Sequence, residues 1–159
     1  MDNLPDLKPA NLNEVLILDG TIPEYDIDSP SVQNVPATKV ERDDVYFPYS
    51  AEIVYSVSYR KHGDTQGIQG LVNVSVSQYP NSEWAKYSFK SDRMSPIPVS
   101  KSRDARNISK QGNTILTALI YGEPHYYWVS GNMLVSLTFG GSEPESLLSA
   151  YLKRHPSSL

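Results

Sequence analysis

The stretch from Glu123 to Phe139 constrains the fold most strongly, because it predicts two strands joined by a tight turn. Gly131-Asn132 stands in its middle, and this pair suits the backbone angles of a two-residue hairpin. Aromatic and β-branched residues are frequent in both strands, which indicates that at least one face of the hairpin is buried. A helix is predicted directly afterwards, over residues 142–154, where Ser142 and Glu145 have the spacing of a capping box.

Alternation of apolar and polar residues predicts further strands over residues 45–60 and 71–79, and a branched-residue run predicts one over 114–121. Residues 82–92 have helical spacing after the cap residues Pro80 to Glu83, and Pro96 prevents continuation. Residues 101–110 are either a loop or a short strand around 105–109. We therefore expect an α+β domain: an antiparallel sheet of about five or six strands, with the two helices packed on one face.

The first 44 residues differ from the rest in proline content and charge. They contain five prolines and carry a net charge of −7, whereas residues 45–159 carry +3. We expect an extended, acidic N-terminal arm over 1–44 and the α+β domain over 45–159. The arm is either a flexible leader or a segment that wraps the domain or inserts into a partner. Val15, Leu16, Ile17 and Leu18 favour the second interpretation, because disordered linkers seldom carry four consecutive large aliphatic residues.

Residue usage excludes several kinds of chemistry. The chain has no cysteine, so disulfides, thiolate nucleophiles and cysteine-based zinc sites are absent. His62, His125 and His155 have no metal-ligand spacing, and no phosphate-binding glycine loop is present. We therefore expect no metal, no cofactor and no catalytic residues. A hydrolase with a dispersed triad is a remote alternative, and it requires His62 or His125 beside a serine and a carboxylate.

Charge and hydropathy limit the partners. The net charge of −4 argues against a dedicated nucleic-acid-binding protein. No apolar run reaches the roughly 18–20 residues of a membrane span, and the first residues lack the pattern of a signal peptide. We expect membrane association only through a partner or through an anchor removed before Met1.

Two surfaces are candidates for partner binding. Basic residues cluster between Lys86 and Lys110 and include Lys101, Arg103 and Arg106. This segment is either a solvated surface or a site for an acidic group, such as the chain's own arm or an acidic protein. Tyr126 and Trp128 share one side of their predicted strand, and that side is either core or a platform for a sugar, peptide or lipid head group.

Three segments together resemble a known architecture. They are VSVSQYPNSEWAKY, YYWVSGNMLVSLTF and PESLLSAYLKRHPSSL. The combination resembles small bacterial extracytoplasmic α+β domains of the PsbP/Mog1-like type over roughly residues 45–159. The resemblance implies a sheet covered by helices, an accessory or binding role, and an extracytoplasmic or periplasmic location, with the cytoplasm as the alternative. It carries no catalytic residues.

The combined expectation is a non-enzymatic accessory or interaction domain. It would dock to a larger protein assembly partly through its arm, with Val15 to Leu18, Tyr126, Trp128, Lys101, Arg103 and Arg106 as contact residues. The alternative is a periplasmic module that binds a small ligand or a carbohydrate on an exposed aromatic sheet face.

Overall fold

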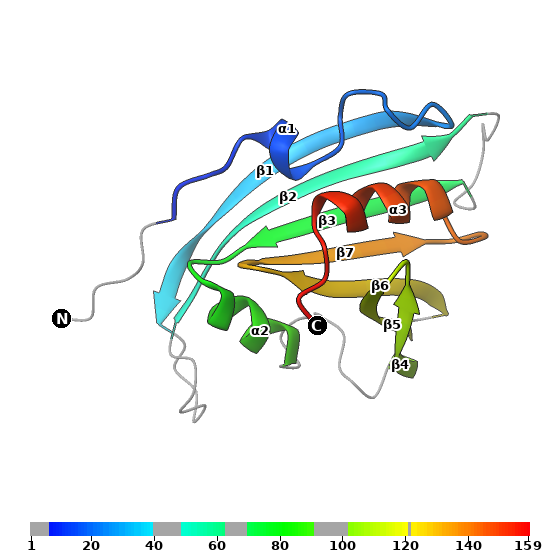
Figure 1. Cartoon of the computed structure of the whole chain (residues 1–159). Helices are drawn as coiled ribbons and strands as arrows, with labels where there is room; N and C mark the ends of the chain where they lie inside the picture. Colours follow the sequence, from blue (N-terminus) through cyan, green and yellow to red (C-terminus); the bar gives the residue numbers. More distant parts are fainter. Residues whose placement is uncertain (1–6, 40–48, 63–69, 91–101, 121) are drawn as a thin grey trace.

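The computed structural model describes residues 7–39, 49–62, 70–90, 102–120 and 122–159. These residues form one seven-stranded antiparallel sheet and three helices, shown in Figure 1. In chain order the elements are α1 (Leu12–Val15), β1 (Tyr25–Lys39), β2 (Tyr49–Lys61), β3 (Leu71–Gln78), α2 (Ser82–Lys90), β4 (Ser102–Lys110), β5 (Asn113–Ile120), β6 (Glu123–Ser130), β7 (Met133–Phe139) and α3 (Glu145–Arg154). The order in the sheet is β1-β2-β3-β7-β6-β5-β4.

The predicted hairpin forms the middle of this sheet. Ser130 pairs with Met133, so Gly131 and Asn132 make the turn, and Gly131 has the positive φ of 58° that glycine adopts without strain. On its other side β7 pairs with β3, which places Val74 opposite Leu137 and Val76 opposite Val135. The alternation read from the sequence therefore corresponds to one continuous buried face.

The predicted α+β class and antiparallel sheet are confirmed, but the described residues hold seven strands rather than five or six. One additional strand, β1, lies inside the predicted arm and pairs with β2 along most of its length. The other is β4, which extends well beyond the short strand considered around 105–109. β1 was not predicted because its prolines argue against a strand in the sheet interior. Edge strands tolerate proline, and β1 is an edge strand.

The prediction that both helices pack on one face is wrong. Leu147, Leu148, Tyr151 and Leu152 of α3 belong to the large core cluster that contains Trp128 and Val135. Trp84, Ala85 and Phe89 of α2 instead pack near Val129 and Leu134, the next residues along the same two strands. Neighbouring strand residues point to opposite faces, so α2 and α3 cover opposite faces of the sheet.

The predicted capping box of α3 is also wrong. The helix begins at Glu145, and its N-cap residue, Pro144, makes no side-chain capping hydrogen bond. The N–H of Glu145, which the capping box assigned to the Ser142 hydroxyl, donates instead to the carbonyl of Glu143 at 3.0 Å. The carboxylate of Glu143 binds Lys110 and Tyr126.

The predicted division at residue 44 falls outside the described residues. On either side of it, β1 of the arm and β2 of the body share one sheet and one core. Among the described residues, no helix has the length and apolar character needed to cross a membrane.

Candidate docking sites: the arm groove and the adjoining cleft

The beginning of the arm is buried in the domain. We call residues 7–18 the inner arm. Val15, Leu16 and Ile17 are almost completely shielded from solvent and belong to the same core cluster as Tyr55, Tyr59 and Tyr151. The inner arm therefore lies on the sheet face that α3 covers, between that helix and the sheet edge formed by β1 and β2 (Figure 1).

Side chains of the sheet hold the backbone of the inner arm. The Tyr55 hydroxyl accepts from the N–H of Ala10 at 2.8 Å. The Gln78 amide donates to the Lys8 carbonyl at 3.1 Å, and the Tyr59 hydroxyl donates to the Ile17 carbonyl at 2.7 Å. The bond to Ile17 is buried and satisfies a carbonyl that would otherwise lose water without replacement, which costs about 1–3 kcal/mol.

The end of α3 holds the same backbone from the other side. The Tyr151 hydroxyl accepts from the N–H of Ile17 at 3.1 Å. Arg154 donates to the carbonyls of Asn13 and Leu16 at 3.0 and 2.7 Å, and His155 Nε2 donates to the carbonyl of Val15 at 2.8 Å. We call the space enclosed by these side chains the arm groove. It is lined by the following residues of β2, β3, α3 and the residue after α3: Tyr55, Tyr59, Gln78, Tyr151, Arg154 and His155.

The titratable groups deepest in the arm groove are neutral at neutral pH. Burial raises the pKa of the Tyr59 and Tyr151 hydroxyls, which lie 2.5 Å apart. Burial also lowers the pKa of His155, although the hydrogen bond to Val15 opposes this shift. The buried part of the groove thus binds the main chain mostly through neutral hydrogen bonds, which need no charge to be desolvated.

An open cleft of about 840 Å³ adjoins the arm groove. Ile17, Ile22 and Leu152 are its apolar residues most shielded from solvent. The outward residues of α3 lie along it, and its two sides come from the loop after the inner arm and from the turn between β4 and β5. The polar lining residues are Thr21, Glu24, Gln111, Asn113, Ser146, Ser149, Lys153 and Arg154. The lining of the cleft thus includes both apolar and polar side chains.

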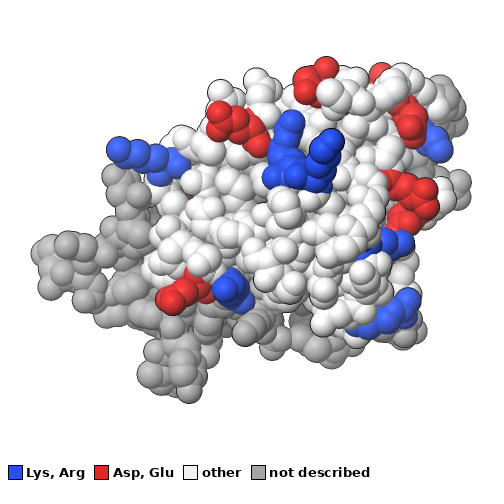
Figure 2. Space-filling view, viewed as in Figure 1, with Lys and Arg blue, Asp and Glu red and all other residues white. Residues whose placement is uncertain are grey.

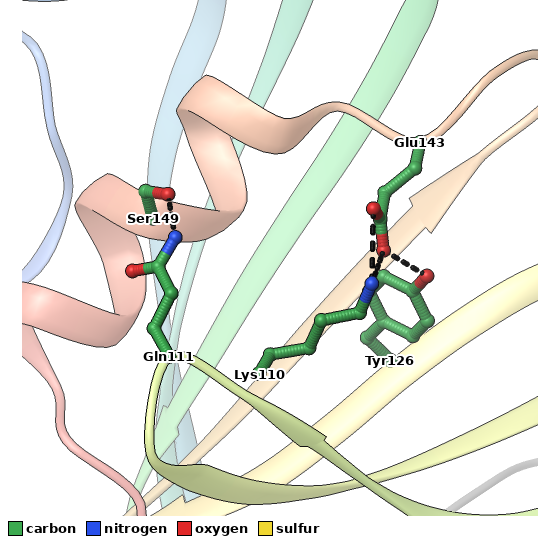
Figure 3. A network of polar contacts seen from close by, with 5 residues as sticks. All are labelled: Lys110, Gln111, Tyr126, Glu143 and Ser149. Carbon is green, nitrogen blue, oxygen red and sulfur yellow. Dashed lines mark hydrogen bonds and ion pairs between the residues drawn. The ribbon is translucent and has the colours of Figure 1, made fainter.

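A polar network fixes the turn between β4 and β5 against α3 (Figure 3). Lys110 forms an ion pair with Glu143 at 2.8 Å, Tyr126 donates to the same carboxylate at 2.5 Å, and Gln111 donates to Ser149. Burial alone would raise the pKa of Glu143, but the hydrogen bonds from Lys110 and Tyr126 outweigh it and leave that pKa below its ordinary value. The ionised carboxylate of Glu143 therefore helps to hold the turn between β4 and β5 in place beside the cleft.

Most of the apolar residues predicted to contact a partner are buried inside the domain. Val15, Leu16 and Ile17 are buried by their own chain and Leu18 is half-buried, which corresponds to the interpretation that the arm wraps the domain. Trp128 is 0% exposed and donates from Nε1 to the His155 carbonyl at 2.7 Å. Tyr126 is buried as well, so both aromatic side chains belong to the core rather than to an open platform.

The basic residues are not brought into one described patch. Lys101 lies outside the described residues, Arg103 lies in β4, and the exposed Arg106 follows it in the same strand. β4 and β1 form opposite edges of the sheet, so the described acidic strand of the arm does not lie on the basic strand. Figure 2 shows acidic and basic side chains interspersed over the face seen there.

The two histidines considered for a triad have other partners. His62 Nε2 lies 2.7 Å from a carboxylate oxygen of Asp26, and both side chains are exposed. His125 Nδ1 contacts the hydroxyls of Tyr127 and Thr138. In the described part of the chain, neither histidine has both a serine and a carboxylate among its hydrogen-bond partners, and no cluster of three potential metal ligands occurs.

The sequence predicts strands and a helix that contain the buried tyrosines, but not the main-chain groups to which their hydroxyls bind. Tyr55 and Tyr59 lie two periods of the alternation apart in the predicted strand 45–60, and Tyr151 lies in the predicted helix 142–154. A buried phenol needs a hydrogen-bond partner, but the sequence does not identify the main chain of the inner arm as that partner. Arg154 and His155 stand at the end of the same predicted helix, where positive charge also suits the helix dipole, so their spacing does not distinguish that role from binding the arm.

Comparisons with protein-family models, with curated proteins and with solved structures give no match for this chain. The resemblance to PsbP/Mog1-like domains therefore stays a prediction.

Proposed function

We propose that the chain is a non-enzymatic interaction module that docks onto a protein partner through the cleft beside α3. The observation that carries the proposal is the cleft itself, which is open and is lined by both apolar and polar side chains. Protein interfaces likewise combine apolar with polar residues. The loop Thr21 to Glu24 forms one side, so the arm takes part in the docking surface.

The shape of the surface favours a polypeptide segment as the occupant. Two smaller cavities of about 480 Å³ each adjoin the cleft around the first turn of α3, and Ser146 lines all three. Together they form a surface with several adjoining hollows rather than one chamber. An extended segment can follow such a surface with several side chains, whereas a small ligand is normally enclosed on most sides.

The alternative of a carbohydrate or small-ligand module depended on an exposed aromatic face. Tyr126 and Trp128 are buried against α3, so this alternative loses its support. Docking to a larger assembly, and an extracytoplasmic or periplasmic location, belong to the proposal as predictions.

A blocking substitution tests the cleft. Ser146→Arg would place a long side chain where the three cavities meet, and Ser82→Arg is the matched control in the first turn of α2 on the opposite face. Each tagged full-length variant is first shown to melt like the unmodified chain. Proteins retained from an extract of the source cells are then compared by quantitative mass spectrometry.

We expect at least one protein retained by the unmodified chain to fall about tenfold or more with Ser146→Arg and to stay with Ser82→Arg, as when access to an interface centre is blocked. That protein, once purified, should bind the unmodified chain directly and the Ser146→Arg variant more weakly. Equal retention of every protein by both variants would contradict docking at the cleft.

A further inference from the structure

The inner arm is bound as a ligand peptide would be, and not as a strand of the sheet. Every hydrogen bond between the inner arm and the rest of the described chain joins an inner-arm main-chain atom to a side chain of the domain. The backbone–backbone bonds made by the described inner arm are those of α1 and its ends. By contrast, β1 is held by antiparallel strand pairing with β2.

This manner of binding does not require that the arm and the groove belong to one molecule. Side chains from β2, β3 and α3 bind N–H and C=O groups at fixed positions, while the core receives Val15, Leu16 and Ile17. Peptide-binding domains combine the same two elements, main-chain hydrogen bonds for affinity and apolar contacts for selection. The groove therefore selects a short segment with apolar side chains. Residues 7–18 are such a segment, since they contain Val15, Leu16 and Ile17.

The connection to β1 can act as a hinge. Asp19, Gly20 and Thr21 are exposed, and Gly20 has a φ of 73° that favours glycine. The six residues 19–24 span at most about 20 Å when extended. An arm that leaves its own groove can therefore reach a second molecule whose α3 side faces the first.

We propose that the arm groove accepts the inner arm of a second copy of this chain, which gives an arm-exchanged dimer. The exchanged state contains the same contacts as the closed state, so little free energy separates them apart from the hinge and the entropy of association. Covalent linkage gives the closed state an effective concentration on the order of millimolar, so the dimer is the minor species in dilute solution and increases with concentration.

Exchange is slow, because Val15, Leu16 and Ile17 must leave the core before the arm can move. A substitution that weakens this burial without altering the hydrogen-bonding side chains should accelerate exchange. Leu16→Ala is suitable, since Leu16 donates no side-chain hydrogen bond and its carbonyl still accepts from Arg154.

The absence of cysteine from the sequence allows a direct test. One batch carries Lys8→Cys in the inner arm and the other carries Gln78→Cys in the groove, at positions joined by the Gln78–Lys8 hydrogen bond. After mixing and incubation, a short bifunctional thiol reagent is added and the heterodimer is measured. The control mixture pairs Ser58→Cys with Asn73→Cys, whose side chains are 2.6 Å apart on neighbouring strands that do not exchange.

We expect the arm–groove mixture to give several-fold more heterodimer than the control, with a yield that rises with concentration and with incubation time. Leu16→Ala in both batches should increase the rate. Heterodimer at the control level in both backgrounds, at concentrations up to about the millimolar effective concentration of the linked arm, would overturn the proposal.

Two synthetic peptides, each added to the mixture, identify the segment that occupies the groove. A synthetic peptide with the sequence of residues 7–18 should suppress heterodimer formation by competing for the groove, and a peptide with Leu16 replaced by Asp should not. Suppression by neither peptide would show that the cross-link does not report occupation of the groove and would count against the proposal. The heterodimer forms from this chain alone, so this test is independent of partner docking at the cleft.

Discussion

The inner arm and β1 are close in sequence, yet they are built into the molecule in different ways. In the inner arm three consecutive aliphatic residues are buried, and domain side chains bind the main chain. In β1 the residues Ser31 to Asn34 are exposed, Val32 is 47% exposed, and β2 binds the main chain. Burial, rather than proline content or acidity, separates the anchoring part of the arm from its surface part.

The irregular course of β1 is consistent with this division. Its pairing with β2 shifts between Asp28 and Ser31 and again between Val35 and Thr38, next to Pro30 and Pro36. Prolines and bulges in an edge strand interrupt its free hydrogen-bonding edge and discourage pairing with other chains. We therefore expect β1 to protect the sheet edge, while the inner arm stabilises the core.

The largest effect should come from removing a buried inner-arm side chain. Leu16 is 0% exposed, so Leu16→Ala should lower the free energy of unfolding by about 2–5 kcal/mol through lost burial and an unfilled cavity. Urea denaturation followed by circular dichroism measures the change. A loss below about 1 kcal/mol would mean that the inner arm is not part of the cooperative core.

A smaller loss should follow removal of one groove hydroxyl. Tyr151→Phe keeps the ring but leaves the N–H of Ile17 without its acceptor and removes the contact between the Tyr151 and Tyr59 hydroxyls, which should cost about 1–3 kcal/mol. Tyr25→Phe is the matched control, because Tyr25 is only half-buried and its ring contacts Tyr59 without a hydrogen bond to it. Equal melting temperatures for the two variants would contradict the role of the Tyr151 hydroxyl.

Protonation of His155 should loosen the inner arm at mildly acidic pH. Burial lowers the pKa of His155 below its ordinary value of 6.5 in the folded chain, so the unfolded chain binds more protons between the two values. Stability from this residue is therefore complete above about pH 6.5 and is lost as the pH falls towards the folded pKa. Melting temperatures between pH 5 and pH 8 measure this loss.

The variant His155→Gln separates this effect from other titrations. Glutamine retains an N–H for the Val15 carbonyl but does not titrate, so the pH dependence should become shallower. His125, whose pKa is also lowered by burial, should account for part of the remainder, and His125→Asn should reduce it further. An unchanged slope in His155→Gln would exclude a contribution from the arm groove.

The smallest effect is expected in β1. Val32→Ala removes two methyl groups from a largely exposed side chain and should change stability by less than about 0.5 kcal/mol. Measured beside Leu16→Ala, it gives the contrast between the two parts of the arm directly. A loss comparable to that of Leu16→Ala would show that β1 is also buried in solution.

Much of the fold could be predicted because local patterns determined it. The hairpin around Gly131-Asn132 has a turn with one preferred geometry, and the alternating valines of β3 leave one buried face. The positions of α2 and α3 were not predictable in the same way. All four residues Tyr126 to Val129 are buried, so both faces of β6 are covered, and sequence alone does not say which helix takes which face.

The arm groove could not be predicted, because its binding groups act on main-chain atoms. The N–H of Ile17 and the carbonyls of Val15 and Leu16 have the same chemistry in any sequence, so no residue pattern identifies them as ligands. The consecutive aliphatic residues Val15 to Leu18 did indicate an anchored segment. Its destination depends on tertiary packing with Tyr151 and His155, more than 130 positions later.

Native-state hydrogen exchange at the amide of Ile17 tests the central claim most directly. If the inner arm is part of the cooperative core, this amide should exchange about as slowly as that of Val74 in the central strand β3, through global unfolding. Tyr151→Phe should accelerate its exchange more than that of Val74. Exchange of the Ile17 amide within seconds, with Val74 still protected, would contradict the account, because the inner arm would then leave its groove rapidly instead of being held in the core.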